Sequence, residues 1–274
     1  MTTPSGAAQP TPESAPEPPR EPRRARGRGR AAGLTIFGVL ILMLVGAFFL
    51  VDAGARSFAE GEAEKYISAS LPASVTGDVT VEIGGVSVIA QFIAGSFDQI
   101  ELTAPELVAD GVPASVHVIA TNVSTNTATY IGKVEATLDF DEAALNGLIQ
   151  SAGTAPGTEL TFGDGDATYG GMLSLAGFEV GYTATATPSA AGNTLVFTPT
   201  SAEVTSDLGS ADVSGVVDLV LGQQPIAVCV AQYLPQDVMM TGVDVTPERA
   251  RITLESSTLT LTAQSLTTLG SCAA

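Results

Sequence analysis

The chain has 274 residues and a formal net charge of −18 at pH 7. Six of its eleven basic residues are arginines between positions 20 and 30, whereas residues 52–274 carry five basic and 26 acidic residues, a formal charge of −21. So acidic a part repels nucleic-acid phosphates, which excludes nucleic-acid binding as a function class. The same charge opposes adsorption to an anionic lipid surface, so a lipid partner has to be held by apolar contacts or by a local basic spot.

The first 51 residues divide into two segments. Residues 1–30 are rich in Pro, Ala, Glu and Arg and contain no large apolar residue after Met1. Such a composition cannot offset the entropy lost on ordering, so we expect a disordered Pro/Arg-rich tail. Residues 31–51 then carry no charge over 21 positions. About 20 apolar residues cross a hydrocarbon core of ~30 Å, so this segment is predicted to be a transmembrane helix.

The arginines before residues 31–51 indicate how the segment is oriented. By the positive-inside rule, the N-terminus is cytoplasmic and residues 52–274 form an extracytoplasmic domain of the cell membrane. The alternative is a cleavable signal peptide, because Ala53-Gly54-Ala55 offers small residues at a cleavage-like site. The apolar run exceeds the ~7–15 residues of a signal peptide, which favours a retained single-pass anchor. Cleavage near Ala55 would instead give a secreted protein.

Cys229 and Cys272 both lie in the exported part. An even number of cysteines in an oxidising compartment favours a disulfide, and two unpaired buried thiols are the alternative. Closing such a loop contributes about 3–4 kcal/mol in chain-entropy models. The sequence has one histidine, His117, so a zinc site of Cys and His is not expected, and no metal or other cofactor is predicted.

The first half of the outer domain mixes helical and strand patterns. Residues 55–71 show apolar spacing of three and four, which predicts a helix ended by Pro72. Residues 78–83 alternate in the manner of a strand. Residues 86–94 are almost continuously apolar and fit either a strand or a helix. Further strands are predicted at 97–104, 115–121 and 127–140.

A single helix is predicted at residues 141–151, where Asp141 and Glu142 suit a helix start. The rest is β-rich, with turn residues between strand-like segments at 160–162, 172–176, 178–187, 194–198, 211–221, 226–230, 238–245 and 249–254. Hairpin turns are expected at 191–193 and 246–248. The predicted class is α+β with a β-rich body.

No group of residues predicts catalysis. His117 lies within a predicted strand, and no G-x-S-x-G motif accompanies it. Asp139, Asp141 and Glu142 form the densest carboxylate cluster, but helix capping accounts for them. The residues 163–166, Gly-Asp-Gly-Asp, lack the spacing of a calcium loop and predict a hairpin turn. We therefore expect a protein that is not an enzyme.

The outer domain has abundant Ala, Val, Ile and Leu on alternating positions. These residues either pack two sheet layers as an ordinary core or line an elongated apolar groove. The order of features over residues 55–262 resembles the LmeA-like phospholipid-binding domain family of actinobacterial envelope proteins. Three stretches carry the resemblance: 78–107, 134–150 and 228–256, the last with Leu234-Pro235 before the closing hairpin.

This resemblance implies a non-enzymatic phospholipid-binding protein whose curved antiparallel sheet wraps on a long helix around an apolar cavity, as in tubular lipid-binding proteins. The cavity residues that it suggests are Ile89, Phe92, Ile93, Phe97, Leu145, Leu148 and Ile149. Arg249 and Arg251 are candidates for a head-group phosphate, with ordinary solvated strand residues as the alternative. The alternative function is a structural or protein-interaction module displayed on the cell surface without a lipid cavity, whose protein partners the sequence does not name.

Overall fold

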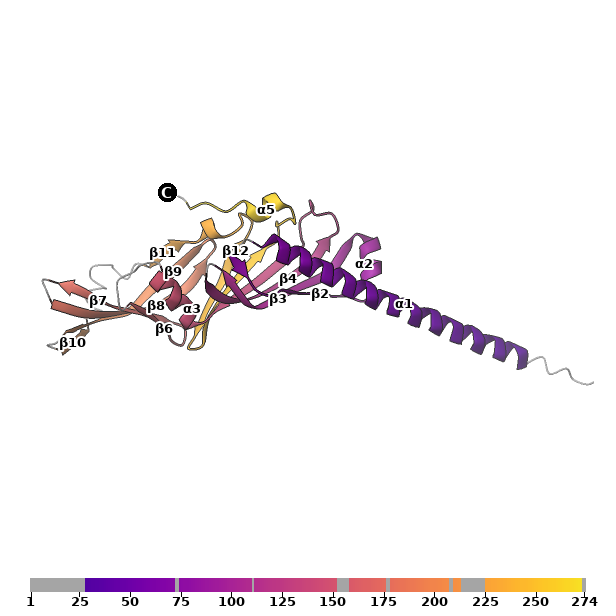
Figure 1. Ribbon diagram of the computed structural model, residues 1–274, viewed down its shortest axis with the longest axis horizontal. Coiled ribbons are helices and arrows are strands. Elements are labelled where there is room, and N and C mark those ends of the chain that lie inside the picture. Colours follow the sequence, from indigo (N-terminus) through magenta and orange to yellow (C-terminus); the bar gives the residue numbers. More distant parts are fainter. Residues whose placement is uncertain are drawn as a thin grey trace, which may run out of the picture. The chain divides into compact units, whose positions relative to one another are not determined.

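The computed structural model describes residues 28–71, 74–109, 111–151, 158–175, 178–206, 209–212 and 225–272. The chain forms two units, Met1–Phe48 and Phe49–Ala274 (Figure 1). The prediction of a disordered tail concerns mostly residues 1–27, which lie outside the described residues. The second unit contains all the strands that the structure describes.

The N-terminal helix α1, Arg28–Ser70, runs through both the apolar segment 31–51 and nearly all of the helix predicted at 55–71. By length and composition it could cross a membrane. Within the apolar segment, Leu42 is 71% exposed, so this stretch is not a core helix of the described chain. The helical prediction for 55–71 is confirmed up to Ser70.

The second unit contains a seven-stranded antiparallel sheet. Its order is β1-β3-β4-β5-β13-β12, with β2 beside β3. The closing hairpin therefore joins the sheet next to β5 rather than next to the strands that precede it in sequence. The strands are β1 (Val75–Thr76), β2 (Thr80–Ile83), β3 (Ser96–Ala109), β4 (Val112–Ser124), β5 (Lys133–Phe140), β12 (Met239–Thr246) and β13 (Arg249–Ser256).

The strand predicted at 127–140 begins only at Lys133, so its first part was wrong. Asn126 explains the difference, because its side chain accepts a hydrogen bond from the Ala128 N–H at 3.1 Å and its carbonyl accepts one from the Thr129 N–H at 2.9 Å. Such an Asn-centred turn competes with strand pairing.

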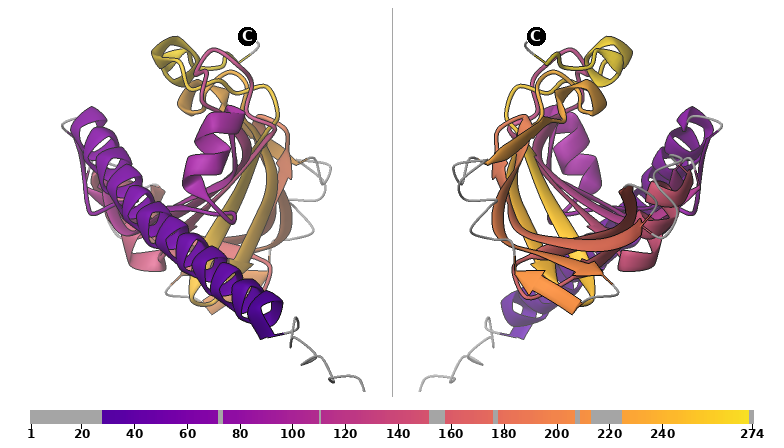
Figure 2. Two further views of the ribbon diagram at one scale, coloured as in Figure 1. Left: turned by 90° about the vertical axis from the view of Figure 1, so that its right-hand side faces the viewer. Right: turned by 90° about the vertical axis from the view of Figure 1, so that its left-hand side faces the viewer.

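A second antiparallel sheet has the order β10-β9-β8-β7-β6, with β11 beside β9. Both sheets curve along their strands (Figure 2). Most of the strand predicted at 211–221 lies outside the described residues. The strands are β6 (Glu159–Phe162), β7 (Ala167–Leu175), β8 (Phe178–Ala191), β9 (Thr194–Ser206), β10 (Gly209–Asp212) and β11 (Ile226–Cys229).

Two predicted turns are confirmed in this sheet. Ala191 pairs with Thr194, so Gly192 and Asn193 form a two-residue hairpin loop. Gly192 has φ +64°, a conformation that glycine adopts without steric cost. Residues 163–166 form the loop between β6 and β7, whose ends Phe162 and Ala167 pair directly. The α+β class and the β-rich body are thus as predicted.

Capping residues determine where the short helices begin and end. The ambiguous segment 86–94 contains helix α2, Val88–Ala94, which begins at Ser87 and ends at Gly95 with φ +88°. Helix α3, Glu142–Ser151, begins where predicted, and Asp141 Oδ1 accepts a hydrogen bond from the Ala144 N–H at 2.6 Å. The C-terminal part adds η1 (Ala231–Tyr233) and α5 (Ala263–Thr267).

The outer edge of β2 bonds to side chains of α1 rather than to another strand. Glu64 Oε1 accepts from the Val81 N–H at 3.0 Å, and Glu60 Oε1 accepts from the Ile83 N–H at 2.9 Å. Arg56 donates to the Ile83 carbonyl at 2.6 Å. Helix residues four apart rise about 6 Å and alternate strand residues lie about 6.8 Å apart, so the two spacings match closely enough for successive bonds.

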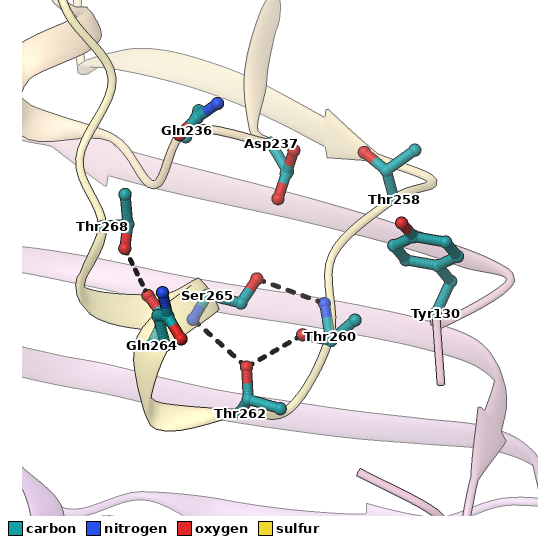
Figure 3. A pocket seen from close by; sticks show the side chains of 9 residues that line it. All are labelled: Tyr130, Gln236, Asp237, Thr258, Thr260, Thr262, Gln264, Ser265 and Thr268. Atoms are coloured by element: carbon teal, nitrogen blue, oxygen red, sulfur yellow. Dashed lines mark hydrogen bonds between the residues drawn. The ribbon is translucent and has the colours of Figure 1, made fainter. Parts of the chain in front are cut away.

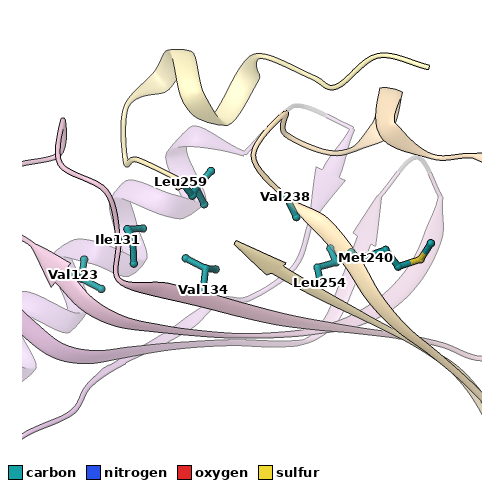
Figure 4. Close-up of a cluster of buried hydrophobic side chains, with 7 residues drawn as sticks. All are labelled: Val123, Ile131, Val134, Val238, Met240, Leu254 and Leu259. Carbon is teal, nitrogen blue, oxygen red and sulfur yellow. The ribbon is translucent and has the colours of Figure 1, made fainter. Parts of the chain in front are cut away.

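The largest buried cluster lies on one side of the first sheet, between its strands and the C-terminal segment (Figure 4). Its seven members are Val123, Ile131, Val134, Val238, Met240, Leu254 and Leu259. The predicted disulfide between Cys229 and Cys272 is present and ties the C-terminal tail to β11. A disulfide indicates an oxidising, extracytoplasmic compartment, since cytosolic thiols stay reduced.

Candidate functional site

The first sheet separates its side chains into an apolar and a polar face. Its register places Leu102, Val118, Ala136, Leu254 and Met240 in one row across five strands. A second row across the same strands consists of Ala104, Val116, Leu138, Ile252 and Val243. We call the side of the sheet that carries these ten residues the apolar sheet face.

The apolar sheet face is covered at its margins and less well in its middle. Ala63 and Ile67 of α1 pack against the cluster of Val79, Val81 and Ala104 at one edge. Elsewhere the C-terminal segment and α3 cover it. Between them Leu102, Val116, Val118, Leu138 and Ile252 are only half-buried. The best-packed residues of this face are Met240 and Leu254, which are buried members of the largest cluster.

The second sheet divides its side chains in the same way. Leu160, Tyr169 and Tyr182 lie on one face, with the two tyrosine rings 6.3 Å apart. Desolvation, with Tyr169 beside it, raises the pKa of Tyr182. The opposite face carries threonines, among which Thr168 and Thr185 bond through their hydroxyls at 2.8 Å.

The apolar faces of the two sheets meet where β12 lies beside β8. Phe162 of β6 forms a buried cluster with Val245 and Ala250 of the first sheet, and Leu160 packs against it. Ala190 of the second sheet packs against the largest cluster. Apolar surface therefore continues from one sheet to the other.

Charged side chains on the polar face of the first sheet form ion pairs with one another. His117 Nε2 lies 2.7 Å from Glu101 Oε1, and Lys133 Nζ lies 2.8 Å from Glu135 Oε1. In the described ranges no group of three or more His, Cys, Asp or Glu residues is placed to hold a metal ion. His117 thus lies on the sheet surface with a carboxylate partner.

Arg249 and Arg251 both lie next to Asp139 on this polar face. Arg251 binds it in bidentate fashion, Nε to Oδ1 at 2.7 Å and Nη2 to Oδ2 at 2.8 Å, while Arg249 Nε lies 3.6 Å from Oδ1. The hydrogen bonds from Arg251 lower the pKa of Asp139. A head-group phosphate at these arginines would have to compete with Asp139, on the side opposite the apolar sheet face.

The seven apolar residues predicted to line a cavity fall into separate places. On α2, Ile89 is half-buried, whereas Phe92 and Ile93 are 66% and 80% exposed. Phe97 packs against the largest cluster. Leu145 of α3 packs against the cluster around Phe162.

On α3, Ile149 is half-buried, and the side chain of Leu148 lies outside the described residues. α2 precedes the start of β3 and α3 follows the end of β5, which are opposite ends of the first sheet. The predicted residues therefore do not form one group, and their contact with lipid stays a prediction.

Two hollows between described residues have polar linings. One, of about 310 Å³, lies between the loop before β5 and the C-terminal segment, where Tyr130 stands beside Thr258 and Thr260 (Figure 3). Some of its hydroxyl groups bond to each other, as those of Thr260 and Thr262 do at 3.0 Å. Another of similar volume lies between α3 and β6 at Asn146 and Glu159. Their chemistry differs from that of the apolar sheet face.

The residues of the apolar sheet face were mostly missed as candidates. Alternation within a strand shows which of its residues share a side, as for Ala136 and Leu138. The strand order that puts Ile252 beside Leu138 depends on pairing across more than one hundred residues. Single-strand periodicity does not contain that information.

Comparison with protein families gives one match. A family model described as LmeA-like phospholipid-binding matches residues 50–255. The comparisons with curated proteins and with solved structures gave no match. The matched span begins at the end of the apolar segment and includes every strand of the apolar sheet face except the last residue of β13.

Proposed function

Because the chain belongs to the LmeA-like phospholipid-binding family, we propose that it is a membrane-anchored, non-enzymatic phospholipid-binding protein of the bacterial cell envelope. Residues 31–51 serve as the single-pass anchor, and the second unit lies outside the cytoplasm. In this role the protein shelters or transfers acyl chains. The apolar sheet face is the surface against which those chains lie.

The observation that carries the proposal is the half-buried middle of the apolar sheet face. Leu102, Val118 and Leu138 share a continuous side of the sheet, yet each keeps part of its surface exposed. Covering apolar surface contributes about 0.8 kcal/mol per buried methylene. A phospholipid chain laid along this face would thus replace water over many methylenes.

The anchor and the outside location are supported by two independent features. The arginines at positions 20–30 favour a cytoplasmic N-terminus under the positive-inside rule. The Cys229–Cys272 disulfide fits an oxidising compartment. The curvature of both sheets and the bonding of α1 to β2 favour the tubular arrangement, in which the sheet wraps on the helix and leaves its apolar side to the ligand.

A space-filling substitution on the apolar sheet face tests the proposal. Ala136 lies in the middle of that face, and its neighbour Thr137 lies on the polar face of the same strand. Ala136→Phe should occupy acyl-chain space, and loss of two methylenes of contact weakens binding about tenfold. Thr137→Phe, the matched control, should leave binding unchanged. Native mass spectrometry of the full chain with added phosphatidylglycerol measures both.

Two outcomes would contradict lipid binding on this face. One is a wild-type chain that purifies without phospholipid and takes none from vesicles. The other is equal lipid binding by the Ala136→Phe and Thr137→Phe variants. The first result would favour the alternative, a structural or protein-interaction module. The second would mean that phospholipid binds somewhere other than the apolar sheet face.

A further inference from the structure

Helix α2 buries its one polar side chain beside Val88 and exposes two of its large apolar side chains. Its one polar side chain, Gln91, is buried at 8% exposure, whereas Phe92 and Ile93 are 66% and 80% exposed. Val86, just before the helix, is 79% exposed. A surface helix usually turns its apolar stripe to the core, so this arrangement indicates an apolar environment outside the helix.

Hydrogen bonds of Gln91 fix which side of α2 faces the sheet. Gln91 Nε2 donates to the carbonyls of Gly84 and Ser87 at 2.9 and 3.1 Å, and its Oε1 accepts from the Asp98 N–H at 2.7 Å. These bonds hold the Gln91 side of α2 against the start of β3. The side carrying Phe92 and Ile93 then faces outward.

The helix is also held on the residue that directly follows the apolar segment 31–51. Asp52 Oδ1 accepts hydrogen bonds from Ser87 Oγ at 2.7 Å and from the Ile89 N–H at 2.9 Å. Its Oδ2 accepts one from the Val88 N–H at 3.2 Å. Since Asp52 is covalently next to Val51, α2 begins within one side-chain length of the place where the apolar segment ends.

Charge around the patch is compatible with a lipid surface. Residues 84–97 contain no charged side chain, in a domain of net charge −21. Two charged side chains that bond to this segment, Asp52 and Arg56, lie 4.0 Å apart, and Arg56 donates to the Gly85 carbonyl. Asp98 follows the segment. The patch therefore escapes most of the repulsion that keeps the rest of the domain away from anionic lipids.

We infer that Val86, Phe92 and Ile93 form a membrane-docking patch that enters the interfacial layer of the extracytoplasmic leaflet beside the anchor. The inference rests on the proposed anchor at residues 31–51. The inserted apolar side chains would hold the apolar sheet face at a constant distance from the leaflet. Acyl chains could then be taken up from the leaflet or released into it. Apolar faces of interfacial helices penetrate ~5–10 Å into this layer.

The absence of tryptophan from the sequence makes the test direct. Phe92→Trp places a single fluorophore in the patch, and Tyr233→Trp places one on η1, where Tyr233 is 75% exposed. Each full-length variant is reconstituted into phosphatidylcholine vesicles with brominated acyl chains. We expect about twofold or stronger quenching of the indole emission of the Phe92→Trp variant, as for a side chain at interfacial depth, and little quenching of the control.

A second arm separates docking from a place in the lipid-binding site. The Phe92→Trp variant is measured in detergent micelles with one equivalent of brominated phosphatidylcholine. Docking predicts no quenching there, because the bilayer is absent. Quenching in micelles would instead place Phe92 against the bound lipid and overturn the inference.

Two further outcomes would contradict docking of the patch in the membrane. If the indole of the Phe92→Trp variant stays accessible to aqueous acrylamide in vesicles, the patch does not enter the leaflet. An indole that is shielded from acrylamide but unquenched by the brominated bilayer would indicate a second copy or a protein partner, and would also overturn docking. Native mass spectrometry on the same preparation reports bound phospholipid. It therefore distinguishes a protein that binds phospholipid but does not dock from one that docks but binds no phospholipid.

Discussion

Helices α2 and α3 lie at opposite ends of the first sheet. They differ in whether their large apolar side chains pack against the domain or are exposed. In α3, Ala144 is buried at 4% exposure and Leu145 packs against the Phe162 cluster. In α2 the buried positions are Val88 and Gln91, and the aromatic residue is outside. Both helices are short and apolar, so composition does not decide which side is buried. Caps and polar anchors decide it.

The largest effect should come from a charge placed on the buried side of α3. Ala144→Asp puts a carboxylate at a buried position of α3, and we expect the free energy of unfolding to fall by about 3 kcal/mol or more. Its exposed neighbour provides the control, because Ala143→Asp adds the same charge at the first turn of the helix and should change stability by less than about 0.5 kcal/mol. Chemical denaturation in detergent micelles measures both, and equal effects would mean that α3 does not bury this side.

The next effect concerns α2, where the polar residue should matter more than the aromatic one. Gln91→Ala removes three hydrogen bonds at a buried position and should cost about 2 kcal/mol. Phe92→Ala removes an exposed ring and should cost less than about 0.5 kcal/mol in micelles. The same denaturation assay compares them. A larger loss for Phe92→Ala would show that α2 packs as an ordinary amphipathic helix.

A smaller effect is expected at the start of α3. Asp141→Ala removes the acceptor for the Ala144 N–H and should destabilise the chain by about 1 kcal/mol, the usual cost of losing an N-cap. Glu248→Ala, at an exposed position in the turn between β12 and β13, is the matched loss of an acidic residue and should be neutral. Amide hydrogen exchange at Ala144 should rise in the first variant alone.

The smallest effect is pH-dependent and involves Asp139, two residues before that cap. Because Arg251 lowers the pKa of Asp139, the unfolded chain binds this proton more readily than the folded chain. The pair therefore stabilises the fold above an unfolded carboxyl pKa of about 3.9, and its contribution is lost as the pH falls through the lower folded pKa.

Because the pair is partly exposed, Asp139→Asn should cost only about 0.5 kcal/mol at neutral pH and nothing at pH ~2. Denaturation midpoints of wild type and variant across this range make the measurement. A difference that persists unchanged at low pH would mean that the side chain acts through packing rather than charge.

Much of the fold followed from local patterns. The alternation in 78–83, the acidic start of α3 and the glycine of the 191–193 turn each predicted the observed element, since local chemistry specifies them. The segment 86–94 could not be assigned in this way. Its helix depends on Ser87 and on Asp52, thirty-five residues earlier in the chain.

The candidate site was harder to predict than the fold. The family resemblance suggested Phe92 and Ile93 as cavity residues, and their exposure in the fold could not be derived from the apolar run that contains them. The spacing of Arg56, Glu60 and Glu64 is that of a solvated helix face, and only the position of β2 shows that these side chains bind a strand. Both cases require a partner distant in sequence, which periodicity does not reveal.

The bonding of α1 to β2 also has a consequence for copies of this chain that lie close together, as the proposed anchor would bring them. An unpaired strand edge is a template for edge-to-edge association, by which sheets of separate molecules join and aggregate. Glu60 and Glu64 already occupy the outward N–H groups of Ile83 and Val81 with carboxylates, which a foreign strand would have to displace. These bonds therefore hinder edge-to-edge pairing between neighbouring copies. The sheet ends at β2 because α1 covers its outer edge.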